Sequence, residues 1–68
     1  MKVGVLGTGD VGKALGSGFF ALGHEVKMGS REPGNPKAQA WVKELGGRVS
    51  AGTFAEAAAF GEVVVVAT

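Results

Sequence analysis

A glycine-rich loop near the amino terminus carries the strongest chemical signal in the sequence. Gly7, Gly9 and Gly12 form the pattern G-x-G-x-x-G between an apolar segment, Lys2–Leu6, and a segment of helical composition. In that setting the first glycine permits a tight turn, the second lets the backbone approach a pyrophosphate, and the third lets the helix pack closely against the strand. The residues predicted to contact the pyrophosphate are Gly7, Thr8, Gly9, Asp10, Val11 and Gly12.

The loop offers backbone N–H groups rather than a reactive side chain. The first N–H groups of a helix have no partner within it, and the helix dipole adds positive potential, so they favour a phosphate. The Thr8 hydroxyl can either donate to a phosphate oxygen or cap the helix. Asp10 is better explained by the first turn of a helix, where an acid stabilises the dipole, than by catalysis. The single histidine, His24, lies in a turn at the opposite end of the predicted sheet. The sequence therefore predicts binding, and it identifies no catalytic residue and no metal site.

A second group of polar residues follows the next predicted strand. Dinucleotide sites for NAD and FAD carry an acid about 20 residues beyond the loop, where it accepts hydrogen bonds from a ribose hydroxyl. Here that place holds Ser30 and Arg31, which can donate to a 2′-phosphate and pair with it in a fork. Glu32 is expected to point elsewhere, and Lys37 is either a second cation of the site or a solvated lysine. The pattern favours NADP(H) and disfavours a methyl donor or a flavin dinucleotide.

The elements that must position these residues are strands and helices, which alternate along the chain. Asn35 and Pro36 are typical of a helix start, Trp41 belongs to an apolar helical stripe, and Thr53 with Glu56 matches a capping box. The predicted strands are 2–6, a segment around 26–30, 48–50 and 63–66, and the predicted helices are 10–22, 36–45 and a short one that ends at 60. This order predicts an α/β fold that is the first half of a Rossmann-type parallel sheet, with strand order 3-2-1-4, and residues 1–68 are expected to be the N-terminal part of one dinucleotide-binding domain.

Two segments are more apolar than a sheet of these four strands with its helices alone requires. The run Val63–Val66 lacks the alternation of a half-exposed strand and predicts a strand covered by helices on both faces. In the first helix, polar residues are confined to one narrow stripe, and Phe19 and Phe20 are not expected to face the same sheet. We expect either a truncated chain or a covering partner, with a homo-oligomer formed through the fourth strand or the first helix as one form of the latter.

Composition limits the other partners. Seven Lys and Arg residues oppose six Asp and Glu residues, and this net charge of +1 gives no broad attraction to nucleic acid or to an anionic membrane. The longest apolar run, Val63–Ala67, is too short to span a bilayer, and no cysteine is present. A cytoplasmic protein is expected.

Three segments together resemble a known family. They resemble the N-terminal domain of the deazaflavin-dependent NADP reductases, and the segments are Lys2–Gly12, Leu22–Val26 and Gly29–Arg31. That family is related to pyrroline-5-carboxylate reductases and to metalloreductases. The resemblance implies that the glycine loop holds the pyrophosphate, that the Ser-Arg pair takes the 2′-phosphate, and that the nicotinamide lies near Ala67 and Thr68.

The family's activity is a hydride transfer between NADP(H) and a second redox partner such as a deazaflavin. The later strands and the substrate domain of that family have no counterpart in these 68 residues. The resemblance therefore implies the cofactor-binding part of an oxidoreductase. The alternative is a non-catalytic NADP(H)-binding or regulatory module assembled through its exposed edge strand.

Overall fold

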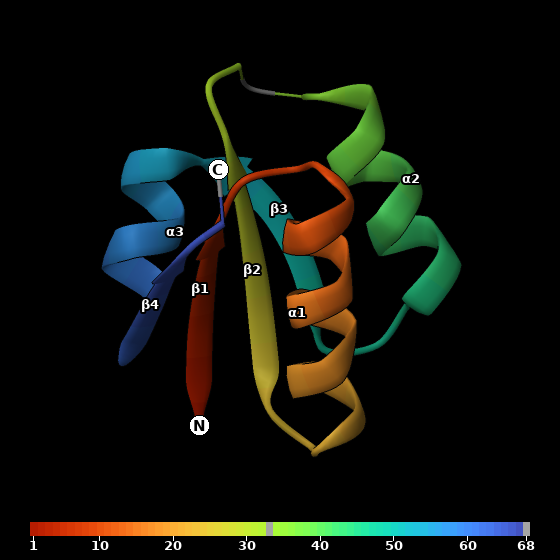
Figure 1. Ribbon diagram of the computed structural model, residues 1–68, viewed down its shortest axis with the longest axis vertical. Coiled ribbons are helices and arrows are strands. Elements are labelled where there is room, and N and C mark those ends of the chain that lie inside the picture. The colour runs from red at the N-terminus through yellow and green to blue at the C-terminus, as the bar shows by residue number, and fades with distance from the viewer. Residues whose placement is uncertain (33, 68) are drawn as a thin grey trace.

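The computed structural model describes residues 1–32 and 34–67, which form one parallel β-sheet with helices on both faces (Figure 1). The strands are β1 (Lys2–Leu6), β2 (Glu25–Ser30), β3 (Val49–Thr53) and β4 (Val63–Val66), and the helices are α1 (Asp10–Ala21), α2 (Pro36–Leu45) and α3 (Phe54–Phe60). The sheet order is β3-β2-β1-β4, and each neighbouring pair is parallel. The predicted Rossmann-like α/β fold and its strand order are confirmed.

The two faces of the sheet are covered differently. Helices α1 and α2 lie on one side, and α3 lies on the other (Figure 1). On the α3 side the sheet is lined by glycine: a Cβ on Gly4 would overlap the Ala57 carbonyl oxygen, and one on Gly29 would lie 2.9 Å from the Ala57 Cβ. Small residues on both elements therefore let α3 pack directly on the backbones of β1 and β2.

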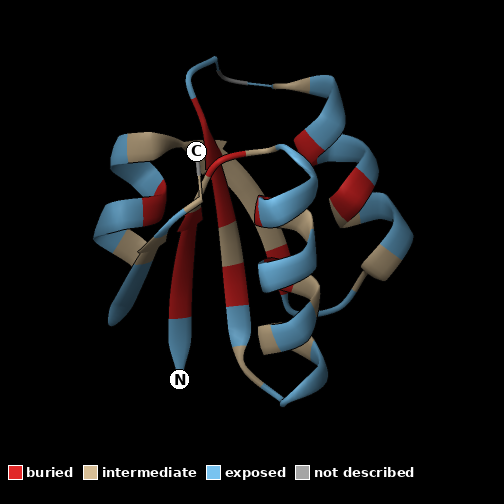
Figure 2. Ribbon diagram, in the orientation of Figure 1, coloured by how far each residue is buried: buried red, intermediate tan, exposed pale blue. Residues whose placement is uncertain are grey.

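The hydrophobic core lies between the sheet and the α1–α2 layer (Figure 2). Its buried residues are Val3, Val5, Val26, Met28, Ala38, Trp41 and Val49. Trp41 joins the two helices, because a Cβ on Gly16 would lie 2.8 Å from its ring, and its Nε1 donates to the Ser17 Oγ at 3.1 Å. Gly16 is thus needed for the close contact between α1 and α2, and Trp41 is a core residue, as predicted.

Several boundaries and side chains differ from the expectations. The third strand extends to Thr53 because Ala51–Thr53 pair with Met28–Ser30, and α3 begins directly after it at Phe54. Phe19 and Phe20 are both partly buried and pack against the core, which contains residues of α2 as well as of the sheet, so the expectation that the two rings do not face the same sheet stays a prediction.

Strand β4 lies at an edge of the sheet and pairs with β1 alone among the described strands. Three of its valines are exposed, by 42% at Val63, 42% at Val64 and 69% at Val66. The expectation of helices on both of its faces is therefore wrong for residues 1–32 and 34–67, in which β4 forms an unpaired edge. Within the same residues, no helix has the length and apolar character that crossing a membrane requires.

The start of α3 gives the fold a pH dependence. Glu56 Oε1 accepts a hydrogen bond from the Thr53 backbone N–H at 2.8 Å, and Thr53 Oγ1 accepts one from the Glu56 backbone N–H at 3.2 Å. The hydrogen bonds to Thr53, the backbone one first, with a smaller attraction to Lys27, lower the pKa of Glu56 below its ordinary value of 4.5. A lowered pKa contributes stability above the carboxyl group's unfolded pKa, and this contribution is lost as the pH falls through the folded pKa.

We expect the free energy of unfolding to decrease as the pH falls below 4.5, and Glu56→Gln to reduce that decrease because the amide gains no proton. Denaturant titrations at a series of pH values measure both slopes. Glu44→Gln, on the exposed face of α2, is the matched control for the loss of one carboxylate. An unchanged slope in Glu56→Gln would show that the acid sensitivity arises elsewhere.

Candidate functional site

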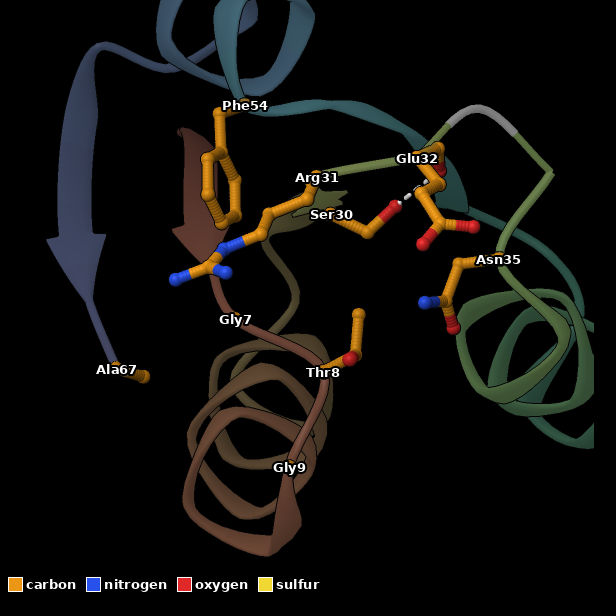
Figure 3. A pocket seen from close by; sticks show the side chains of 9 residues that line it. All are labelled: Gly7, Thr8, Gly9, Ser30, Arg31, Glu32, Asn35, Phe54 and Ala67. Carbon is orange, nitrogen blue, oxygen red and sulfur yellow. Dashed lines mark hydrogen bonds between the residues drawn. The ribbon is translucent and has the colours of Figure 1, made fainter.

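A cavity of about 340 Å³ lies at the carboxyl ends of the strands (Figure 3). In a parallel sheet these ends meet at one edge, and the crevice beside them is where α/β folds of this kind bind ligands. The lining residues come from the loop after β1, the end of β2 and the segment after it, the start of α2, the start of α3 and the end of β4; they are Gly7, Thr8, Gly9, Ser30, Arg31, Glu32, Asn35, Phe54 and Ala67.

The three glycines of the loop have different local reasons for being glycine. Gly7 has a φ of 137°, which L side chains rarely adopt, and its N–H donates to the Gly29 carbonyl at 3.0 Å. A Cβ on Gly12 would overlap the Gly7 carbonyl oxygen, so the third glycine lets α1 pack against the loop. Gly9 is exposed, and a Cβ there would meet nothing within 4 Å. The described protein therefore gives no steric reason for glycine at Gly9, whose missing side chain leaves open space beside the helix start.

That open space adjoins N–H groups of the first turn of α1. The first helical hydrogen bond runs from the Lys13 N–H to the Gly9 carbonyl at 3.0 Å, and no side chain caps the helix among the described residues. Thr8 therefore does not cap α1 in this structure, although its side chain lines the cavity. Helix-start N–H groups, the helix dipole and a hydroxyl together suit an oxyanion.

The residues after β2 form the other side of the cavity. Ser30 is buried, and its hydroxyl donates to the Glu32 carbonyl at 2.6 Å, which bends the chain as it leaves the strand. The exposed side chain of Arg31 places its guanidinium between Phe54 and Gly7 in the view of Figure 3. Arg31 thus extends into the same cavity as the glycine loop.

Glu32 also lines this cavity, so the expectation that it points elsewhere is wrong. That expectation assumed the alternation of an extended strand, which the bend after Ser30 interrupts. In Figure 3 the Glu32 carboxylate faces Asn35, on the other side of Ser30 from the Arg31 guanidinium. Arg31 and Glu32 are the charged residues among those that line the cavity within the described part of the chain.

The structure brings together six of the predicted site residues: Gly7, Thr8, Gly9, Ser30, Arg31 and Ala67. Asp10, Val11 and Gly12 form the first turn of α1, beside the cavity rather than in its lining. Lys37 is exposed near the start of α2, where its backbone N–H donates to the Asn35 Oδ1 at 2.9 Å, and it does not line the cavity. Thr68 lies outside the described residues.

Sequence reasoning missed two lining side chains, Asn35 and Phe54. Asn35 caps α2 through its Oδ1, as predicted, and it also lies beside the cavity. A predicted third strand that ended at Thr53 would have indicated Phe54 as a site residue, because the residue after that strand must lie at the carboxyl edge of the sheet. The described residues contain no group of three or more potential metal-ligating side chains. The arrangement can bind a long ligand with phosphates, and its described residues show no acid–base pair or metal centre for chemistry of its own.

Comparisons with known proteins place the chain in a family. Residues 2–68 match the family model described as NADP oxidoreductase, coenzyme F420-dependent. Among solved structures, the chain is similar to a proposed F420-dependent NADP-reductase from Arthrobacter sp. FB24, with 40% sequence identity and a TM-score of 0.86. That similarity covers 100% of this chain and 33% of the other, so the chain spans about a third of its relative's length. No match was found among curated proteins. This chain, with its Rossmann-like half-sheet and its glycine loop, belongs to the family of coenzyme F420-dependent NADP oxidoreductases.

Proposed function

We propose that this chain is the NADP(H)-binding part of an oxidoreductase that transfers a hydride between NADP(H) and a second redox partner such as a deazaflavin. One observation carries the proposal: the open space at Gly9, beside the start of α1, and the guanidinium of Arg31 belong to the same cavity. Helix-start N–H groups suit a pyrophosphate, and a guanidinium suits a terminal phosphate, which it can bind in a fork. Membership in an NADP-dependent family supports the same ligand.

Each part of the site has its own role in this proposal. The N–H groups of Asp10, Val11 and Gly12, together with the Thr8 hydroxyl, bind the pyrophosphate. Arg31 binds the 2′-phosphate of the adenosine ribose.

Two other residues take smaller parts. Ser30 can donate to the 2′-phosphate only by giving up its bond to the Glu32 carbonyl, because a hydroxyl has one hydrogen. Lys37, exposed at the start of α2, stays a prediction as a second cation.

The nicotinamide end of the ligand is assigned to the end of β4, at Ala67 and Thr68. The bound cofactor supplies the hydride chemistry, and the protein supplies binding and orientation. No catalytic residue is assigned. Arg31 and Glu32 are the charged residues that line the cavity within the described part of the chain; Arg31 binds the 2′-phosphate, and the Glu32 carboxylate faces Asn35.

Titration of the chain with NADPH and with NADH, followed by nicotinamide fluorescence, tests the proposal. We expect NADPH to bind at least about tenfold more tightly, because one hydrogen bond to a charged group contributes about 1.5–3 kcal/mol. Equal affinities would refute the assignment of the 2′-phosphate to Arg31. Absence of binding for both would refute the assignment of the cavity as a dinucleotide site.

A second candidate is a non-catalytic NADP(H)-binding module that assembles by pairing two β4 edges. The exposure of Val63, Val64 and Val66 along an unpaired strand favours it. Both candidates bind NADPH, so binding does not separate them. A dimer in light scattering supports the module, whereas a monomer supports the binding part of an oxidoreductase.

A further inference from the structure

Phe54 is an aromatic residue in the cavity that the hydrophobic core does not use. Its side chain is half-buried and lines the cavity, and it is absent from the residues that pack against the core. The core does include both Phe19 and Phe20 among its partly buried members. The ring of Phe54 therefore presents apolar surface to the cavity instead of filling the interior.

The backbone of Phe54 is held firmly in place. It is the first residue of α3, directly after the capping box formed by Thr53 and Glu56. On its inner side, a Cβ on Gly29 would lie 3.1 Å from the Phe54 Cα and 3.0 Å from the Thr53 carbonyl oxygen, so β2 and the start of α3 are in close contact. The ring is thus attached to a closely packed part of the fold.

The same packing places Phe54 beside Arg31. Ser30 and Thr53 are partners in the β2–β3 register, and Arg31 and Phe54 are the residues that follow them. Both side chains line one cavity, and in the view of Figure 3 the end of the Arg31 side chain lies below the Phe54 ring. The ring and the guanidinium therefore border the same cavity.

The side chain of Arg31 is exposed, and within residues 1–32 and 34–67 it makes no side-chain hydrogen bond and no ion pair. A long side chain without partners samples many rotamers, and ordering it on binding lowers the affinity. An adjacent aromatic ring attracts a guanidinium and reduces the directions that it can take.

We infer that Phe54 is a positioning residue, whose ring keeps the Arg31 guanidinium directed into the cavity and so raises the preference for a dinucleotide that carries a 2′-phosphate. This inference rests on the proposed function. It assigns Phe54 to the selectivity of the site rather than to its general affinity, because NADH has no group for Arg31 to bind.

The experiment compares Phe54→Leu, Phe54→Tyr and the control Phe60→Leu, which changes the aromatic residue at the far end of α3, near Lys2 and Lys27. Binding of NADPH and NADH is measured for each, with thermal unfolding to confirm folding. For Phe54→Leu we expect NADPH affinity to fall by about two- to fivefold with NADH affinity unchanged, because a cation near an exposed ring contributes that much. Phe54→Tyr should restore the wild-type ratio, and Phe60→Leu should keep it. Combining Phe54→Leu with Arg31→Ala should add no further loss.

Other outcomes overturn the inference. Equal losses for NADPH and NADH in Phe54→Leu would mean that the ring stacks on a part common to both ligands, such as the adenine. An unchanged ratio, or a further selective loss in the Arg31→Ala background, would remove the link to Arg31. In each of these cases the wild-type chain still binds NADPH and the proposed function stands, whereas a wild-type chain that binds neither dinucleotide defeats the proposed function itself.

Discussion

Replacing Arg31 by alanine is expected to weaken NADPH binding by about ten- to a hundredfold and to leave NADH binding unchanged. The guanidinium extends into the cavity from the end of β2, and in the proposed complex it binds the 2′-phosphate. Hydrogen bonds between charged groups contribute about 1.5–3 kcal/mol each, and 1.4 kcal/mol corresponds to a factor of about ten in affinity. Because NADH lacks the 2′-phosphate, its affinity provides the internal reference. Isothermal titration of the variant with each dinucleotide measures both values.

The local charge balance strengthens this expectation. Arg31 and Glu32 are the charged residues that line the described cavity, so removing the guanidinium leaves the Glu32 carboxylate as its charged side chain, in the same cavity as the phosphate. Like charges at close range repel, and the loss should therefore lie toward the upper end of the range. Arg48→Ala is the matched control, since Arg48 lies just before β3 at the opposite end of the sheet and its guanidinium donates to the Gly23 carbonyl at 3.5 Å. A similar loss in Arg48→Ala would indicate a general effect of net charge.

The glycine-loop side of the site was predictable because its signals are local. The signals are glycine spacing, an apolar run and helix-capping residues, and each acts over a few positions. The predicted bounds are therefore confirmed for β1 (2–6), α2 (36–45) and β4 (63–66). Asn35 accepts hydrogen bonds from Lys37 and Ala38 as a helix cap should. The positions of Gly7, Thr8 and Gly9 in the cavity follow directly from this alternation of strand, loop and helix.

The other side of the cavity depends on contacts between elements distant in the sequence. Phe54 reaches the site only because β3 continues to Thr53 in register with Ser30, and the polar, glycine-containing sequence of β3 gives a weak strand signal. Glu32 lies at the site because Ser30 bends the chain through a hydrogen bond that no periodicity predicts. The contact between Trp41 and Gly16 likewise joins two helices whose apolar patterns do not identify their partners.

Gly12 and Gly18, near the start and the end of α1, should respond to an alanine substitution in opposite ways. Gly12→Ala adds a Cβ that overlaps the Gly7 carbonyl oxygen, and overpacking of this kind lowers the free energy of unfolding by about 1–3 kcal/mol. In a chain of 68 residues, whose buried surface is small, such a loss is a large share of the total stability. Thermal or denaturant unfolding measures it, and Gly18→Ala on the same helix, where a Cβ meets nothing within 4 Å, should instead be stabilising.

Gly9→Ser should leave the fold intact and weaken the binding of the dinucleotide. Gly9 is the N-cap of α1, with extended backbone angles that serine adopts readily, and a serine hydroxyl there can accept hydrogen bonds from the first-turn N–H groups. The free energy of unfolding should therefore stay the same or increase slightly. The added side chain occupies the open space and the same N–H groups that the pyrophosphate needs, so NADPH and NADH affinities should both fall, by about tenfold or more. The equal loss separates this effect from that of Arg31→Ala, which is selective for NADPH. If Gly9→Ser bound both dinucleotides as tightly as the wild type, the start of α1 would not be the pyrophosphate site, even with Arg31 correctly assigned.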